Sequence, residues 1–170
     1  TLFPYTTLFP MSLLTHLYLL PKGRWEFADV QRPMILLRDL DRWLGIELHF
    51  GQPVVETLTG DHPRWNPVSK SPMGVFLHEG EVWIWEFGKD PRLIWRQSEP
   101  LHEIAWHKSG NALFMADKKS LHVIHLTDPT QTSQRLAEFD ELIDFTLVNN
   151  DLYLNGTHDG KTGLWRLRVE

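Results

Sequence analysis

Residues 101–126, LHEIAWHKSGNALFMADKKSLHVIHL, have the pattern of three short strands separated by two polar turns. The first turn, residues 107–111, contains Gly and Asn, which adopt positive φ at little cost. Residues 113–116 are apolar on both faces of the second strand, which indicates that this strand is buried. The second turn covers residues 117–120, and a third apolar strand follows over residues 121–126. This stretch is the best-defined unit of the chain.

Looser copies of the unit lie on both sides of it. Residues 82–87 match residues 121–126 at an offset of 39, and residues 163–167 match residues 122–126 at an offset of 41. The weaker segment 135–139 adds a fourth strand to the central copy. A strand-rich repeat of roughly 40 residues is typical of a four-stranded propeller blade.

The tryptophans recur in phase with these strands. Trp65 and Trp106 each precede a polar turn and an apolar strand, and they lie 41 positions apart. The alternative is a single antiparallel sandwich whose regular hairpins imitate a repeat. Because the tryptophans repeat together with the turns, we predict an all-β chain that forms a partial β-propeller. It would hold about three to four four-stranded antiparallel blades, the last of them incomplete.

The predicted divisions of the chain follow the repeat. Within the first blade-like region, residues 38–45 fit either a helical turn or a polar hairpin tip. About four units fall short of the number that usually closes a propeller, so we expect these residues to be the C-terminal part of a larger ring. The divisions are a segment outside the fold (1–10), a degenerate blade-like region (11–61), two blades (62–99 and 101–139) and an incomplete C-terminal blade (140–170).

The first twenty residues have an unusual sequence. Residues 1–10, TLFPYTTLFP, repeat TLFP at Thr1 and Thr7. They resemble the conceptual translation of a sequencing adapter that contaminates metagenomic assemblies, which implies that the native chain begins near Met11. A disordered native terminus is the alternative. Residues 11–20 form an apolar run of ten residues, too short for a bilayer, which takes about 20, and without a basic segment typical of a secretion signal. We expect a buried strand there.

Composition excludes several classes of site. The 170 residues are 42% hydrophobic and 23% charged, with a net charge of −5. This balance argues against a nucleic-acid surface or an anionic-membrane surface, both of which need clustered Lys and Arg. The chain has no cysteine, which excludes disulfides, thiolate zinc sites and cysteine nucleophiles. The sequence also lacks a G-x-S-x-G elbow, an H-E-x-x-H zinc motif, a phosphate-binding P-loop and a G-x-G-x-x-G fingerprint.

The nine histidines raise the question of a metal site. His122 and His125 are three positions apart on one expected strand, so their side chains point to opposite faces. His102, His107 and His158 lie at turns of different units. We therefore expect no metal site and no cofactor.

Three further patterns have a functional and a structural interpretation. Paired carboxylates occur at Asp140-Glu141 and at Asp144, but glycosidase chemistry needs a set separation across a cleft that sequence does not give. Asp159-Gly160 is a hairpin turn signal before it is a calcium ligand. Five tryptophans at strand spacing form either an aromatic ligand platform or packing between blades, and we expect packing. They are Trp83, Trp85, Trp95, Trp106 and Trp165.

Two resemblances to known proteins follow from these motifs. The turn at residues 106–111, followed by Leu113-Phe114 and Val123-Ile124, resembles WD-repeat and Tol-type periplasmic propellers, although the Gly-His and Trp-Asp dipeptides of WD repeats are absent. LIWRQSEP (93–100), LHEIAW (101–106) and LWRL (164–167) resemble the C-terminal region of PEGA-domain-containing bacterial proteins. That resemblance implies an envelope protein with an N-terminal membrane anchor, small β modules and a propeller-like end.

The resemblance to propellers also implies a binding face. Partners of such propellers usually contact the turns between second and third strands and the links between successive blades. Mixed charge at these positions is equally typical of any solvated turn. The implied binding residues are Glu79, Ser98, Glu99, Lys118, Lys119, Asp140, His158 and Asp159.

These patterns lead to two functional hypotheses. The first is a non-catalytic interaction or scaffold module of a larger bacterial envelope protein, outside the cytoplasm, with a cytoplasmic location as the alternative. It would bind a protein or envelope polymer and the missing N-terminal blades of its own chain, and contact neither nucleic acid nor membrane through this segment. The second is the propeller domain of a hydrolase, a peptidase or glycosidase, whose catalytic residues lie outside these 170 residues. Fold alone does not decide between them.

Overall fold

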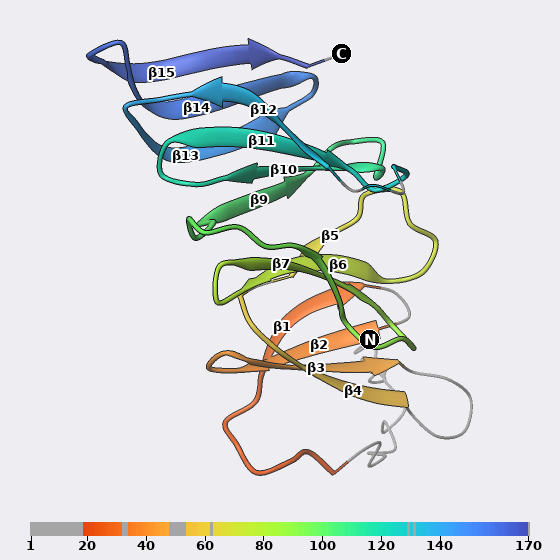
Figure 1. Ribbon diagram of the computed structural model, residues 1–170. Coiled ribbons are helices and arrows are strands. Elements are labelled where there is room, and N and C mark those ends of the chain that lie inside the picture. The colour runs from red at the N-terminus through yellow and green to blue at the C-terminus, as the bar shows by residue number, and fades with distance from the viewer. Residues whose placement is uncertain are drawn as a thin grey trace, which may run out of the picture.

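The chain forms a row of antiparallel β-sheets (Figure 1). Within the described residues of this computed structural model there are fifteen strands and no helix, so no described segment is a helix long and apolar enough to cross a membrane. The prediction of an all-β chain is confirmed. The expectations for residues 1–10, and for most of the apolar run that follows them, lie outside the described residues. The structure describes residues 19–31, 34–47, 54–61, 63–128, 130 and 132–169.

The first two sheets lie in the N-terminal half of the chain, and each has four strands in sequence order. The first sheet comprises β1 (Glu26–Gln31), β2 (Met34–Asp39), β3 (Arg42–Glu47) and β4 (Val54–Thr59). The second sheet comprises β5 (Arg64–Trp65), β6 (Met73–His78), β7 (Glu81–Glu86) and β8 (Arg92–Trp95).

The last two sheets contain the repeat from which the fold was predicted. The third sheet has four strands and the fourth has three, again in sequence order. The third sheet comprises β9 (Glu103–Trp106), β10 (Ala112–Ala116), β11 (Ser120–His125) and β12 (Ser133–Glu138). The fourth sheet comprises β13 (Glu141–Val148), β14 (Asp151–His158) and β15 (Lys161–Arg168).

One ambiguity of the sequence is resolved in the first sheet. Asp39 pairs with Arg42 across the β2–β3 connection, so this segment is a two-residue hairpin tip and not a helical turn. Leu40 stands at the tip with φ of 59°. Positive φ is uncommon for a leucine, so the residue type at position 40 does not point to this turn.

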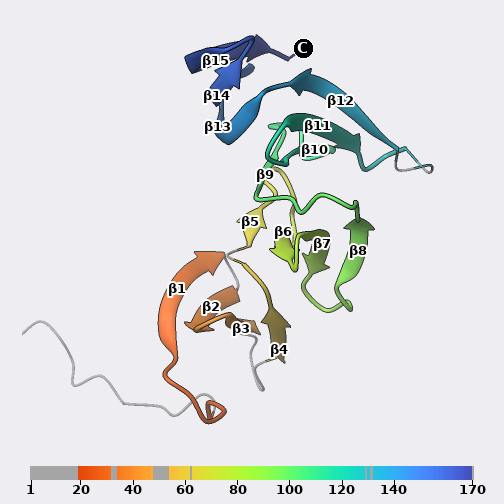
Figure 2. The same ribbon diagram turned by 60° about the vertical axis from the view of Figure 1, so that its left-hand side comes forward.

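The four sheets are arranged as a fan. Figure 2 shows their first strands β1, β5, β9 and β13 along one concave side and their last strands along the outer side. A hollow of about 650 Å³ lies on the concave side and is lined by residues of β5, β9 and β13. Within it Arg64 Nη2 lies 3.4 Å from Glu103 Oε1. The innermost strands of neighbouring sheets are therefore held side by side.

The core consists of apolar layers between successive sheets. Trp85 is buried in the layer between the first two sheets, and Trp106 in the layer between the second and third. Trp83, Trp95 and Trp165 are half-buried. Trp83 packs against the layer between the first two sheets, Trp95 against the layer between the second and third, and Trp165 against the layer between the third and fourth. The five tryptophans therefore pack between sheets, as expected.

Indole N–H groups also link one sheet to the next. Trp85 Nε1 donates to Glu56 Oε2 at 2.8 Å, and Trp106 Nε1 donates to the Arg64 carbonyl oxygen at 2.6 Å. Trp85 approaches the first sheet closely because Gly45 has no side chain. A Cβ at Gly45 would lie 2.6 Å from Trp85 Cη2, nearer than atoms pack in protein interiors.

Candidate functional site

The turns between second and third strands, and the links between sheets, emerge at one end of the fan. Strand direction alternates in an antiparallel meander, so these connections share an end while the other connections lie at the opposite end. The eight residues implied as binding residues all fall on this end, which we call the turn face. All of them are exposed except His158, which is half-buried.

Two of the turns on this face have the same geometry. Glu79-Gly80 have φ of 52° and 77°, and Asp159-Gly160 have φ of 50° and 70°. Each pair joins strands whose flanking residues are paired. Two residues at positive φ make a type I′ hairpin turn, which matches the twist of the strands. The interpretation of Asp159-Gly160 as a hairpin turn is therefore confirmed.

Backbone hydrogen bonds bring the β10–β11 turn against the link that leads to the fourth sheet. The Phe139 N–H donates to the Lys119 carbonyl at 2.7 Å, and the Leu142 N–H donates to the Lys118 carbonyl at 2.6 Å. Asp140 continues the chain of contacts, because its Oδ2 accepts from the Gly160 N–H at 2.8 Å. Both lysine side chains are left exposed beside the link.

His158 is fixed against the same link. Its Nδ1 lies 2.9 Å from the Glu138 carbonyl oxygen. A carbonyl only accepts hydrogen bonds, so Nδ1 carries the proton and Nε2 faces Asp159, whose Oδ2 is 3.7 Å away. The ring packs between Phe139 and Trp165, at centroid distances of 5.4 and 5.2 Å. Lys118, Lys119, Asp140, His158 and Asp159 thus form one cluster over three chain segments, which we call the C-terminal cluster.

Glu79, Ser98 and Glu99 form a second group around the β6–β7 turn. The Leu101 N–H donates to the Gly80 carbonyl at 3.4 Å, and a Cβ at Gly80 would lie 2.9 Å from Pro100 Cβ. The link after β8 therefore lies directly over this turn.

Asp117 connects the two groups, and the sequence analysis did not single it out. Its carboxylate is buried and accepts four hydrogen bonds. Its Oδ1 accepts from the N–H groups of Lys119 and Ser120 at 2.8 and 2.7 Å. Its Oδ2 accepts from Gln97 Nε2 at 3.1 Å and from His122 Nε2 at 3.3 Å. Asp side chains often accept hydrogen bonds from backbone N–H groups two or three residues further along a turn. An Asp at the start of the predicted turn 117–120 was therefore the sequence signal that could have identified this residue.

These bonds set the ionisation of Asp117. Burial by itself raises the pKa of a carboxyl group, but here the donors from Lys119, Ser120, Gln97 and His122 outweigh it and hold the pKa below its usual value. The carboxylate is therefore charged at neutral pH. His122 uses Nε2 for this contact, and its buried Nδ1 has no hydrogen-bond partner among the residues that the structure describes.

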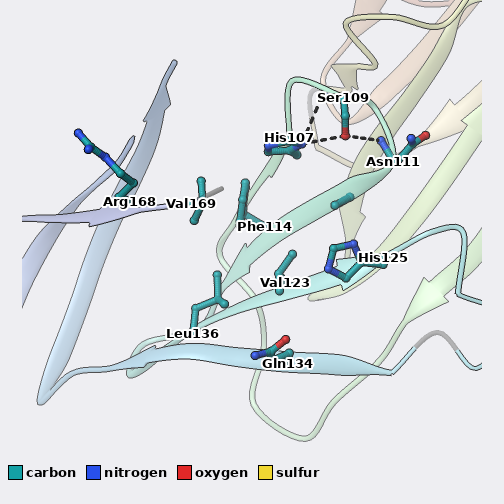
Figure 3. Close-up of a pocket in the computed structure, with 11 residues that line it drawn as sticks. His107, Ser109, Asn111, Phe114, Val123, His125, Gln134, Leu136, Arg168 and Val169 are labelled. Carbon is teal, nitrogen blue, oxygen red and sulfur yellow. Dashed lines mark hydrogen bonds between the residues drawn. The ribbon is translucent and has the colours of Figure 1, made fainter. Parts of the chain in front are cut away.

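The histidines and acids weighed in the sequence are dispersed. His122 contacts Asp117, whereas His125 points to the other face of β11 and lines a hollow together with Val123 (Figure 3), as alternation along a strand predicts. Asp140 lies on the turn face, while Asp144 lines the hollow on the concave side. In the part of the chain that the structure describes, no three His, Asp or Glu side chains are grouped so as to hold a metal ion.

Comparisons with solved structures identify the architecture. The chain matches Hsv2 of Kluyveromyces marxianus with a TM-score of 0.60 and 11% identity, over 88% of this chain and 48% of that one. It matches Hsv2 of Kluyveromyces lactis with a TM-score of 0.59 and 10% identity, over 88% and 50%. The fold is a β-propeller. The match to the N-terminal domain of Nup159 has a TM-score of 0.53 and 9% identity, over 86% and 44%.

The prediction of a partial propeller is therefore confirmed, and the four sheets are consecutive blades. The chain spans about half the length of the propellers it matches. At these identities the likeness establishes the fold alone. No protein-family model and no curated protein sequence matches the chain. The resemblance of residues 1–10 to an adapter translation, and the narrower one to PEGA-domain proteins, receive no support from these matches.

Proposed function

We propose that this chain is a non-catalytic propeller segment that binds a partner protein through the C-terminal cluster of the turn face. The observation that supports this proposal best is that hydrogen bonds join the three chain segments that carry the cluster. They involve the carbonyl groups of Lys118 and Lys119 and the side chains of Asp140 and His158. Because the backbone beneath these charges is already held in place, only the exposed side chains lose conformational entropy when a partner binds. Positively and negatively charged residues lie close together in this cluster, which favours a partner with the complementary charge pattern.

Other observations support a protein partner. The Saccharomyces cerevisiae structure that contains Nup159 is an assembly with Dbp5 and Gle1, so a propeller of similar fold occurs in a protein complex. By analogy alone we extend this use to the present chain. An extracytoplasmic envelope location rests only on the resemblance of residues 93–106 and 164–167 to PEGA-domain proteins.

We also propose that further blades complete the ring. The chain spans half of its structural neighbours, and the end blades expose apolar side chains on the faces that a neighbouring blade would cover. Phe27 on β1 is 81% exposed, and Leu164 on β15 is 73% exposed. Blades of a propeller normally bury such faces against each other.

The proposed binding face is tested by charge reversal. The double variant Lys118→Glu/Lys119→Glu changes the cluster without touching the two carbonyl groups that hold it. The matched control is Lys70→Glu/Lys108→Glu, because both of these lysines are exposed and lie at the opposite end of the fan. Immobilised wild-type chain and both variants are used to capture proteins and, separately, isolated cell-wall polymer from a bacterial envelope fraction.

We expect one protein to be retained by the wild type and the control and lost by Lys118→Glu/Lys119→Glu. Equal retention by all three chains would overturn the assignment of the face. Retention of the polymer, and not of a protein, would overturn the assignment of the partner class.

A further inference from the structure

The tip of the first blade displays a leucine on the turn face, where the other blades display charged residues. In three of the hairpin turns on this face the first turn residue has positive φ, at 59° for Leu40, 52° for Glu79 and 50° for Asp159. Leucine is uncommon in this conformation, and Leu40 is 80% exposed. Its own blade gains no stability from such a residue, so a contact with another molecule is the explanation to test.

Neighbouring blades do not cover a tip of this kind. The second blade packs between the first and the third, and its tip residue Glu79 is still exposed. At the first blade the link to the next sheet is in place, because the Gly60 N–H donates to the Asp41 carbonyl oxygen at 3.0 Å. The segment before the blade is in place too, since a Cβ at Gly23 would lie 3.0 Å from Arg42 Nη2. The leucine stays exposed with both connections beside it.

Two arginines brace the hairpin that carries the leucine. Arg38 Nε donates to the carbonyl oxygen of the leucine at 2.7 Å, and its guanidinium carbon lies 5.2 Å from the Trp43 ring centroid. Arg42 pairs with Asp39, and its guanidinium carbon lies 5.3 Å from the Trp25 ring centroid. The tip is therefore ordered before a partner binds, which lowers the entropic cost of the contact.

The surroundings of the leucine are basic. Residues 21–25 and 38–42 contain four cationic side chains and two carboxylates, in a chain whose net charge is −5. A binding site for this tip should therefore be an apolar pocket with an excess of acidic residues around it. The cationic residues, all of them exposed, are Lys22, Arg24, Arg38 and Arg42.

The chain itself carries an apolar notch between its first two blades. The notch has a volume of about 180 Å³, and its apolar lining residues are Leu58, Phe76, Trp83 and Pro91. One water takes about 30 Å³ of liquid volume, so the notch is large enough for the four carbon atoms of a leucine side chain. Both blades already have four strands, so a further blade at either end of the row would not fill the notch.

The notch has the charge that the tip requires. It is surrounded by β4 and residues 78–96, which contain five carboxylates and three cationic side chains. The excess of two negative charges matches the excess of two positive charges at the tip. The carboxylates are those of Glu56, Glu79, Glu81, Glu86 and Asp90, and the cationic residues are Lys89, Arg92 and Arg96.

We propose that Leu40 of one copy of this chain enters the notch between the first and second blades of a second copy. Tip and notch belong to the same molecule, so two copies related by a two-fold axis make the contact twice and form a closed dimer. This inference goes beyond the function proposed above and does not depend on it. It concerns the first two blades, and Lys118→Glu/Lys119→Glu should leave the dimer unchanged.

Sedimentation velocity of the 170-residue chain over a range of concentrations tests the proposal. We expect a monomer–dimer equilibrium in the micromolar range that weakens with added salt. Leu40→Asn should weaken the dimer at least about tenfold, because the apolar anchor is lost. Asn tolerates positive φ better than leucine, so this variant should also unfold at a higher urea concentration than the wild type. A weaker dimer together with a more stable chain cannot result from a damaged fold.

Two further variants make the test specific. Val68→Asn is the matched control, because Val68 is 58% exposed in the β5–β6 connection at the opposite end of the fan, and it should form the dimer as the wild type does. Pro91→Trp places a larger side chain in the notch and should weaken the dimer as Leu40→Asn does. An equal mixture of Leu40→Asn and Pro91→Trp should associate more tightly than either variant alone, because Leu40 of the second then meets the open notch of the first.

Three results would overturn the proposal. The first is a chain that stays monomeric at every concentration, which would leave the tip without a site on a second copy. The second is a dimer that Leu40→Asn does not weaken. The third is a dimer that is lost in Phe27→Ser/Leu164→Ser and kept in Leu40→Asn, since the copies would then associate through the exposed faces of the end blades.

Discussion

Gly45 decides how closely the first two blades approach each other, and its replacement by alanine tests the packing directly. The added Cβ would lie 2.6 Å from Trp85 Cη2 and 3.0 Å from Met34 Sδ. Both neighbours are essentially unexposed, Trp85 at 1% and Met34 at 0%. They have no solvent-filled space to move into, so the overlap must be relieved by displacing the blades or their side chains.

The expected magnitude follows from two opposing effects. Overpacking in a well-packed core costs about 1–3 kcal/mol. Replacing a strand glycine by alanine contributes about 0.5–1 kcal/mol in the opposite direction, because the unfolded chain loses conformational freedom. We therefore expect Gly45→Ala to lower the free energy of unfolding by about 1–2 kcal/mol.

Urea denaturation followed by tryptophan fluorescence measures this change. Gly163→Ala is the matched control, because a Cβ there meets no atom within 4 Å, and it should be neutral or slightly stabilising. The double variant Gly45→Ala/Trp85→Leu should show a favourable coupling, since the smaller side chain makes room for the methyl group. The reasoning is refuted if Gly45→Ala is as stable as Gly163→Ala.

Three further predictions test other parts of the structure. Trp106→Ala should lower the free energy of unfolding by about 3–5 kcal/mol, as for other buried aromatic residues, because it removes a buried ring and the hydrogen bond to the Arg64 carbonyl. Thermal unfolding followed by circular dichroism measures this loss of stability. A loss below about 1 kcal/mol would contradict the packing. Gly160→Ala should lower the free energy of unfolding by about 1–2 kcal/mol through backbone strain alone, since φ is +70° and an added Cβ would meet no atom within 4 Å. Equal stability of Gly160→Ala and Gly163→Ala would contradict this reasoning. The hydrogen bonds to Asp117 outweigh its burial and lower its pKa, so the charged carboxylate stabilises the fold above the unfolded pKa of 3.8, and this stabilisation is lost as pH falls through the folded pKa. The difference in free energy of unfolding between wild type and Asp117→Asn, about 2 kcal/mol at pH 6, should therefore shrink steadily toward pH 3 in urea titrations. A pH-independent difference would argue against this role of Asp117.

Strand positions were largely predictable because the information is local. Alternation of apolar residues located β9, β10 and β11 close to their observed bounds, and Asp159-Gly160 marked its turn through the backbone freedom of glycine. The β2–β3 turn was ambiguous, because Leu40 takes a backbone conformation that its residue type disfavours. Pattern analysis therefore works where turn chemistry and side-chain type agree, and is ambiguous where they conflict, as at Leu40.

The sites depend on connections that the sequence does not order in space. Gln97 reaches Asp117 from a link 20 positions earlier. The hollow that His125 lines likewise combines residues of the third sheet with the end of β15. The turn face could be anticipated, since alternating strand direction places its turns at one end. That the C-terminal cluster binds a partner stays a prediction.

Each blade is made of consecutive residues, and the strands that the structure describes pair with their neighbours in sequence. A blade can therefore complete its hydrogen bonding soon after its own forty or so residues leave the ribosome. What it then lacks is a cover for one apolar face, and the next blade to be synthesised supplies that cover. Translation in this order limits how much apolar surface is exposed at any moment, because only the outer faces of the first blade and of the most recently completed blade are then uncovered.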